Sequence, residues 1–319
     1  MKKQFFIKLI CFFLVLLLLP IGYFAAIQSL PAMFRGSLMG SIYTKQQLLE
    51  QTPGSRVILV GGSSVPYSIE CETVSKAMEM PCISMGATAY LGMEYYLNLL
   101  DDYLHEGDIV ILAPEFSMLQ NSVSYSTTWM AVENSPTLMK ALPISYFPQM
   151  ITSYYSYGSQ KLSLWKQKGA STLTPQEEYA AFGFGPWGDI TTQRETLLES
   201  GYDKHNLLSL DETSLSLKVV KAINQFYKKA KKVGATVLMT WAPFNELAYT
   251  GTPEQLHQFE EKLYSQIKVP YIGTLSDCML SSDLFYDSNN HLTSKGAALR
   301  TKILLDDLFN SKIETIKIW

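Results

Sequence analysis

Short apolar segments separated by helical patterns constrain the fold of this chain most. The first segment, RVILVGG at residues 56–62, is an uninterrupted run rich in β-branched residues, as strands buried on both faces are. Four more follow: CISMG at 82–86, DIVILAP at 108–114, ATVLMTWAP at 235–243 and VPYIG at 269–273. The alternation predicts an α/β fold, a three-layer sandwich whose central parallel sheet carries helices on both faces.

The helical patterns between these segments carry their own start signals. Patterns extend over residues 68–80 and 93–107, and a third amphipathic pattern begins at Asp211. Thr252 opens a fourth helix with the sequence TPEQ, which predicts a reciprocal capping box. Thr293 is the expected N-cap of the last helix, which follows the fifth strand segment.

The N-terminus predicts a membrane anchor. Lysines in the first eight residues precede an uncharged apolar run from Leu9 to Ile27, and these nineteen residues are enough to cross a bilayer. Because lysines stay on the cytoplasmic side, we expect a single-pass protein with a cytoplasmic N-terminus. Residues 1–28 would form the anchor and residues 29–319 an extracytoplasmic domain. A cleaved signal peptide is the alternative, although the small residues of a cleavage site are missing.

Composition excludes some partners and leaves the cysteines open. The formal net charge of -3 shows no basic excess, so we expect no nucleic-acid partner. Cys71, Cys82 and Cys278 lie outside the apolar run and have no zinc-ligand spacing, so we expect no metal site. Cys71 and Cys82 could meet in a disulfide if the helix between them folds back, or remain unpaired small hydrophobic residues.

A long irregular segment interrupts the alternation. Residues from about 117 to 210 are rich in Tyr, Ser, Thr and Gly and are too many for a loop. We interpret them as an inserted cap over one end of the sheet, with Trp187, Tyr154 and Tyr155 as aromatic candidates for substrate contact. The alternative is a packed helical subdomain without ligand contacts.

The segment FYDSNNHLTSKGA, residues 285–297, has two readings. Thr293 can cap the last helix, which explains the segment structurally. A cap needs no imidazole, however, and His291 precedes the helix with Asp287 within loop reach, as the base and the orienting acid of a catalytic site require. Parallel sheets place their chemistry beyond the carboxyl ends of strands, and the first strand ends in GGSS. Ser63 is therefore the candidate nucleophile.

These blocks resemble the SGNH, or GDSL-like, hydrolase superfamily. Gly61-Gly62-Ser63 is similar to the family's first block, His291 to its general base and Gly86 to the glycine of its second block. The resemblance covers roughly residues 55–116 and 211–310. It implies that Ser63, Asp287 and His291 form a catalytic triad, and that backbone amides at Ser64 and Gly86 form the oxyanion hole.

Two positions depart from the family pattern. Ser288 stands at the third position before His291, where the family has its acid, so Asp287 must act from one residue further back. The strand at 108–114 is followed by Glu115 and not by the family's Gly-x-Asn, so the side-chain oxyanion donor is absent. Losing one such donor typically costs about a hundredfold or more in rate.

The anchor, the domain and the insertion together resemble the D-alanine transfer protein of teichoic acid biosynthesis and polysaccharide acetylation proteins. The resemblance implies an esterase or O-acyltransferase that acts through an acyl-serine, without a metal or an organic cofactor, on a cell-surface polysaccharide. It also implies an acyl donor and a membrane-bound O-acyltransferase as partners. The alternative is a non-catalytic accessory protein that binds a polymer or such an acyltransferase, which both departures favour.

Overall fold

The computed structural model describes residues 2–167, 183–210 and 214–311. Its core is a parallel sheet in the order β2-β1-β3-β4. The strands are β1 (Val57–Gly61), β2 (Cys82–Ser84), β3 (Ile109–Ala113) and β4 (Thr236–Met239). The predicted α/β class with a central parallel sheet is therefore confirmed, and four of the five predicted strand segments form it.

The fifth segment, VPYIG, does not become a strand. Within it, Tyr271 makes a single parallel bridge to Met239, the last residue of β4. The amide of Ile272 donates to the Met239 carbonyl at 2.9 Å. A second sheet that the sequence did not suggest pairs β5 (Phe244–Asn245) with β6 (Met279–Leu280). Pairing over so few residues leaves no periodic signal in the sequence.

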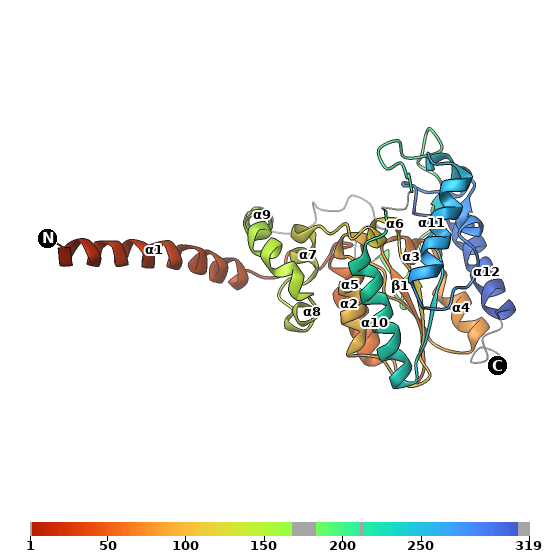
Figure 1. The fold of residues 1–319 in the computed structure, drawn as a ribbon, viewed down its shortest axis with the longest axis horizontal. Coiled ribbons are helices and arrows are strands. Elements are labelled where there is room, and N and C mark those ends of the chain that lie inside the picture. Colours follow the sequence, from red (N-terminus) through yellow and green to blue (C-terminus); the bar gives the residue numbers. More distant parts are fainter. Residues whose placement is uncertain (1, 168–182, 211–213, 312–319) are drawn as a thin grey trace.

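The strands are buried on both faces because successive side chains point to opposite sides of a strand. On one face, Ile58, Val60, Val110 and Leu112 pack in the larger apolar cluster, and on the other face Val57, Leu59 and Ile111 pack in a second cluster. The helices α5 (Met93–Asp101) and α10 (Leu217–Val233) contribute to the first cluster, whereas α4 (Cys71–Met78) and α12 (Ser294–Asn310) contribute to the second. Figure 1 shows these helices around the sheet.

Helix boundaries follow the capping chemistry more closely than the apolar periodicity. At α11 (Pro253–Gln266) the Thr252 hydroxyl accepts from the Gln255 amide and the Gln255 side chain accepts from the Thr252 amide, which confirms the capping box. Thr293 caps α12 in the same way, with its hydroxyl 3.1 Å from the Gly296 amide. By contrast, α10 begins at Leu217, and Asp211, its predicted start, lies outside the described residues.

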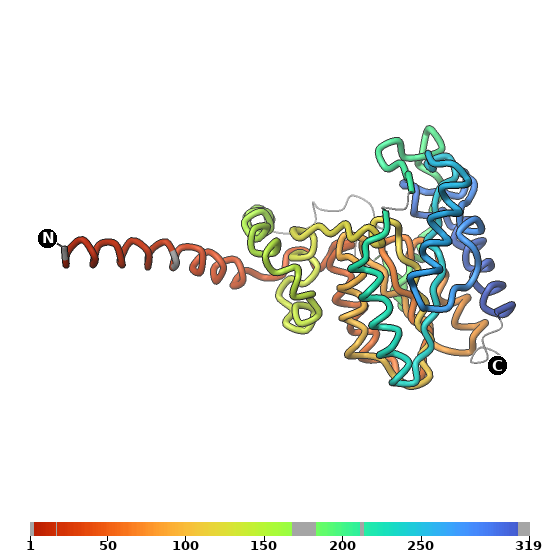
Figure 2. The backbone as a smooth tube through the Cα atoms, in the orientation of Figure 1, coloured from red at the N-terminus to blue at the C-terminus, as the bar shows by residue number. Residues whose placement is uncertain are grey.

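Part of the predicted insertion is helical. It contains α6 (Phe116–Leu119), α7 (Tyr125–Ala131), α8 (Pro136–Lys140) and α9 (Phe147–Lys166), and then an irregular stretch at 183–210. The helices α7–α9 lie at the base of the N-terminal helix α1 (Lys2–Ser29), as Figures 1 and 2 show. The irregular stretch instead begins beside the β2 edge of the sheet, where the Ser84 amide donates to the Trp187 carbonyl at 2.9 Å, and it reaches the loop before α12, where Asn289 donates to the Asp203 carbonyl. The two halves of the insertion therefore serve different parts of the molecule.

The helix α1 projects from the body of the protein (Figure 1). Its segment Lys3–Ser29 is long and apolar enough to span a membrane, and its most apolar window is fully exposed. The helix α2 (Ser41–Gln51) follows after a short linker and rejoins the core.

Buried polar groups connect the insertion to the sheet. Lys45 of α2 is 1% exposed, and its ammonium donates to the carbonyls of Ser84 and Gly188. Burial lowers the pKa of Lys45 to about 7, opposed by the nearby Cys71 and Asp189. The Asp189 carboxylate in turn accepts from the Cys71 amide at 2.9 Å.

The two cysteines whose state the sequence left open lie in this region. The helix α4 folds back between Cys71 and Cys82, and their Sγ atoms lie 3.2 Å apart as free thiols. Burial is the main cause of the raised pKa of the Cys71 thiol. They therefore pack as small apolar groups in this structure.

Candidate active site

Ser63 follows β1 directly and forms the N-cap position of the short helix α3 (Ser64–Ser68). The two glycines before it are required for space. A Cβ on Gly61 would lie 2.3 Å from the Ala113 carbonyl oxygen, and one on Gly62 would lie 2.3 Å from a Glu115 carboxylate oxygen. Neither glycine has a positive φ, so conformational freedom is not what requires the pair. Close packing of β1 against β3 explains it instead.

His291 and Asp287 come from the loop that precedes α12. This loop is held as a narrow hairpin, because Phe285 and Leu292 form an antiparallel bridge and the Tyr286 amide donates to the His291 carbonyl at 2.8 Å. The loop then enters α12 at its cap, Thr293. The hairpin and the cap thus fix both side chains relative to the sheet.

The structure brings Ser63, Asp287 and His291 together from opposite ends of the chain. His291 Nε2 lies 2.9 Å from Ser63 Oγ, and His291 Nδ1 lies 2.8 Å from Asp287 Oδ1. The His291 side chain is 9% exposed and that of Asp287 is 14% exposed. With the Nδ1 proton directed toward the carboxylate, Nε2 is the ring nitrogen that can accept the serine proton, as a nucleophile, base and orienting acid require.

Asp287 lies one residue further from His291 than the acid in the family pattern that the sequence resembles, and its carboxylate still reaches the ring. Ser288 has a different part in the loop, because its hydroxyl accepts from the His291 amide at 3.2 Å. A serine at this position therefore shapes the turn, and the turn lets the preceding aspartate reach the ring.

An aromatic ring and an arginine support the imidazole from behind. The Tyr67 ring stacks on His291 with centroids 4.0 Å apart and an angle of 9° between the planes. Arg194, from the insertion, is 6% exposed. Its guanidinium donates to the Tyr67 carbonyl at 3.3 Å and to the Leu292 carbonyl at 3.2 Å. Arg194 thus connects α3 to the loop between Phe285 and Thr293 that carries His291, which we call the histidine loop.

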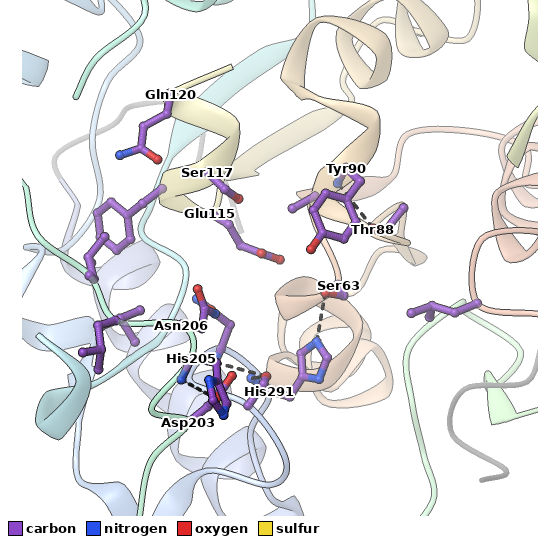
Figure 3. A pocket seen from close by; sticks show the side chains of 18 of the residues that line it. Ser63, Thr88, Tyr90, Glu115, Ser117, Gln120, Asp203, His205, Asn206 and His291 are labelled. Carbon is purple, nitrogen blue, oxygen red and sulfur yellow. Dashed lines mark hydrogen bonds between the residues drawn. The ribbon is translucent and has the colours of Figure 1, made fainter. Parts of the chain in front are cut away.

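Ser63 and His291 open into a cleft of about 630 Å³. Figure 3 shows the hydrogen bond between Ser63 and His291 in this cleft. Tyr90 and Glu115 lie near Ser63, and Asp203, His205 and Asn206 form a separate group that also lines the cleft. Apolar lining comes from Leu38, Met39, Ala89, Phe116, Leu207, Leu208 and Phe244. The cleft therefore combines apolar walls with a few convergent polar groups, as small-molecule sites do.

The insertion contributes to this cleft through residues 203–209. Asn289, fully buried in the histidine loop, donates to the carbonyls of Asp203 and Asn206 at 2.8 and 2.7 Å. Figure 2 shows this green segment beside the blue C-terminal part of the chain. The same loop that presents His291 thus also holds one wall of the cleft.

The predicted oxyanion donors have different surroundings. Gly86 packs tightly behind Ser63, since a Cβ there would lie 2.3 Å from the Gly62 carbonyl oxygen. The Ser64 amide already donates to the Glu115 carboxylate at 2.8 Å. Glu115 is 8% exposed and follows β3, where the family pattern has its asparagine. A carboxylate therefore occupies one of the amides that was expected to bind an oxyanion.

Several lining residues carried no sequence signal, and three candidates lie elsewhere. Asp203 and His205 line the cleft from an irregular stretch without a motif. At Glu115 the sequence indicates only that the family's asparagine is absent, and not that the carboxylate lines the cleft. Trp187 lines another, smaller pocket, and Tyr154 and Tyr155 line a groove beside α1. These three aromatic residues do not line the Ser63 cleft, because α9 packs Tyr154 and Tyr155 toward α1, whereas Trp187 lies beside α4 and the edge strand β2.

The remaining titratable groups do not suggest a metal site. Among the residues described, no group of three or more His, Cys, Asp and Glu side chains is placed to hold a metal ion. His257 pairs with Glu261 on the exposed face of α11. His291 and His205 are thus the two histidines that line the cleft in the described part of the chain.

Comparison with known proteins adds no family assignment. A scan against protein-family models and a search of curated proteins both found no match. The functional argument therefore depends on the geometry of the cleft.

Proposed function

We propose that this chain is a membrane-anchored SGNH-like acyl esterase or O-acyltransferase whose domain lies outside the cytoplasm. The observation that carries the proposal is the hydrogen-bonded series from Asp287 through His291 to Ser63 at the mouth of the cleft. Its substrate would be an acyl ester, and its acceptor a hydroxyl of a cell-surface glycan or a teichoic-acid-like polymer, or water.

The arrangement supports a two-step reaction. His291 Nε2 would take the Ser63 proton while Oγ attacks the acyl carbonyl, and the same nitrogen would return the proton to the leaving alcohol. An acyl-serine would remain, and the acceptor hydroxyl would attack it in the reverse sequence. Asp287 would hold the imidazole orientation and stabilise its positive charge in both steps.

An activated-serine probe tests this proposal on the full chain in detergent. We expect a fluorophosphonate to label wild type at Ser63, and an acyl ester to give a burst. Ser63→Ala should abolish labelling, and His291→Ala should lower the rate of labelling and the rate of the ester burst by about 10³-fold or more. The matched controls Ser68→Ala and His257→Ala should keep both signals. Labelling that survives Ser63→Ala would contradict the proposal.

A second candidate is supported by Glu115. With its carboxylate on the Ser64 amide and the family's asparagine absent, the cleft could bind a polymer or a membrane O-acyltransferase without turning over an ester. In that case wild type would resist the fluorophosphonate but bind soluble polymer fragments in the cleft. Replacement of cleft residues such as Phe244 would then weaken polymer binding.

A further inference from the structure

A groove beside α1 remains after the catalytic cleft is accounted for. It has a volume of about 810 Å³ and lies between the outer end of α1 and the helices α8 and α9. Its walls are apolar and aromatic, and among the lining residues Lys140 alone carries a charge. The lining residues are Leu19, Pro20, Tyr23, Phe24, Trp129, Met139, Lys140, Leu142, Phe147, Met150, Ile151, Tyr154 and Tyr155.

The groove continues into an exposed apolar stripe on α9. Phe147, Ile151 and Tyr155 of α9 are 49%, 72% and 74% exposed, and Ile144, in the 3-10 turn just before α9, is 87% exposed. Their spacing of three and four residues places them on one face of the helix. Large apolar side chains gathered in this way mark an interaction surface, because leaving them in water is unfavourable.

The relative position of α1 and α9 is fixed by specific contacts. The Tyr154 hydroxyl donates to the Phe24 carbonyl at 3.2 Å, and their rings lie 4.8 Å apart. Gly158 lets α1 approach closely, since a Cβ there would lie 2.4 Å from the Tyr23 hydroxyl. Figure 1 shows α9 crossing the point where α1 meets the body of the protein. Any membrane position of α1 therefore determines where α9 lies.

The length of the apolar run sets the depth of the groove. Leu9 to Ile27 extend over about 28 Å at 1.5 Å per residue, which matches a hydrocarbon core of about 30 Å. Leu19, a groove residue, lies eight positions before Ile27 and hence about 12 Å inside that boundary. If α1 spans the bilayer, the groove and the facing stripe of α9 lie at the depth of the acyl chains in the leaflet nearer the domain.

We infer that the surface formed by α8, α9 and the groove docks on the membrane, with lipid acyl chains of the leaflet that α1 enters from the domain side as its occupant. The chain would then hold the bilayer at two places: α1 across it and α9 along its surface, with tyrosines at the interface where such rings are enriched. This inference depends on the proposed membrane-spanning role of α1 and is independent of catalysis at Ser63.

Depth-dependent quenching tests it with the full chain in lipid nanodiscs. In a Cys11→Ser background the three remaining cysteines are buried, so one exposed cysteine at a time, at Ile151, Val15 or Leu217, would carry an environment-sensitive fluorophore. Doxyl-labelled phospholipids would serve as quenchers. Leu217 is the matched control, because it is an aliphatic residue 71% exposed at the start of α10. We expect quenching at residue 151 to exceed that at residue 217 several-fold, with shallow doxyl positions most effective.

The outcomes separate the inference from the anchor it depends on. Deep quenching at residue 15 without quenching at residue 151 would keep the anchor and overturn the docking. Absence of quenching at residue 15 would overturn the spanning role of α1 and the docking together. Protection of residue 151 in native membranes but not in nanodiscs would assign the surface to a membrane protein and overturn the lipid as occupant. The Ser63 labelling experiment is unaffected by all three results.

Discussion

Among single residues, the proposed acid Asp287 is the position where the sequence departs from the spacing of the family that it resembles. Asp287 Oδ1 reaches His291 Nδ1 at 2.8 Å, while Ser288 bonds to the backbone of the same loop. The role of each side chain is therefore separable by substitution.

We expect Asp287→Asn to lower kcat for acyl-ester turnover by about 10²- to 10⁴-fold, because the amide would favour the wrong imidazole tautomer. Ser288→Ala should stay close to wild type in kcat, since its hydroxyl bonds only to backbone amides in the loop. Steady-state kinetics of both variants would check this. A larger loss in Ser288→Ala than in Asp287→Asn would reassign the acid.

Glu115 is the residue whose charge opposes acyl transfer most directly. An oxyanion forming beside Ser63 would lie near this carboxylate, and like charges in a partly buried site repel. Glu115→Gln keeps an acceptor for the Ser64 amide and adds a donor. We expect it to raise kcat/KM by about tenfold, equal to ~1.4 kcal/mol of transition-state stabilisation.

The control for Glu115→Gln is Asp203→Asn, which neutralises an acid of the same cleft whose carboxylate accepts from the His205 amide. We expect this control to change kcat/KM little. A fall in turnover in Glu115→Gln would show that the carboxylate is needed, either to hold the Ser64 amide or to bind the substrate.

At the scale of elements, the insertion contacts both segments that carry the proposed catalytic residues, α3 and the histidine loop. Arg194 donates to carbonyls of α3 and of the histidine loop, and further to Ile190 and Thr192 at 3.0 and 2.8 Å. The planar guanidinium can reach these directions together, whereas an ammonium cannot. Arg194 is therefore a positioning residue for His291.

We expect Arg194→Lys to lower kcat by about ten- to a hundredfold with little change in KM, because small displacements of a base are costly. The rate per active site, titrated by the fluorophosphonate, separates positioning from loss of folded protein. Arg35→Lys is the control, since Arg35 stacks on Tyr43 and does not line the cleft. An unchanged rate per labelled site would limit Arg194 to a structural role.

At the scale of the whole molecule, the buried Lys45 makes folding stability depend on pH. Its pKa is about 7 in the folded protein and near 10.5 when exposed in the unfolded chain. Between these values the unfolded state binds more protons, so the unfolding free energy contributed by Lys45 rises with pH. This contribution is complete above pH 10.5 and is lost as pH falls to about 7.

We expect the full chain in detergent to gain unfolding free energy between pH 7 and 9 relative to Lys45→Met, by at most ~1.4 kcal/mol per pH unit. Denaturant titrations at each pH would measure the difference. Lys76→Met, which removes an exposed lysine paired with Glu72, should retain the wild-type slope. Equal slopes in wild type and Lys45→Met would show that Lys45 stays charged in the folded protein.

The two halves of the insertion lie at different places in the molecule. Residues 203–209 line the cleft, and α8 and α9 lie beside the anchor. Leu38 and Met39, in the linker between α1 and α2, also line the cleft. Docking of α9 together with α1 would therefore hold the Ser63 cleft at a fixed height near the membrane surface.

Features that depend on local pattern could be predicted from the amino-acid sequence. Buried strands appear as continuous apolar runs, caps such as Thr252 and Thr293 show their hydroxyls at fixed offsets, and a spanning helix needs an uncharged run. Ser63 could be predicted as a candidate nucleophile because parallel strands place their chemistry beyond their carboxyl ends. His291 could be predicted as a candidate base because a helix cap does not require an imidazole.

Contacts between distant groups, in contrast, follow from the folded arrangement of the elements. Glu115 reaches the Ser64 amide, Arg194 joins α3 to the histidine loop, and Tyr154 packs on Phe24 of α1. No periodicity encodes these contacts, because each joins segments that are far apart along the chain and depends on where other parts of the fold place them. Local sequence specifies elements, whereas the packing of elements specifies the environment of a catalytic group.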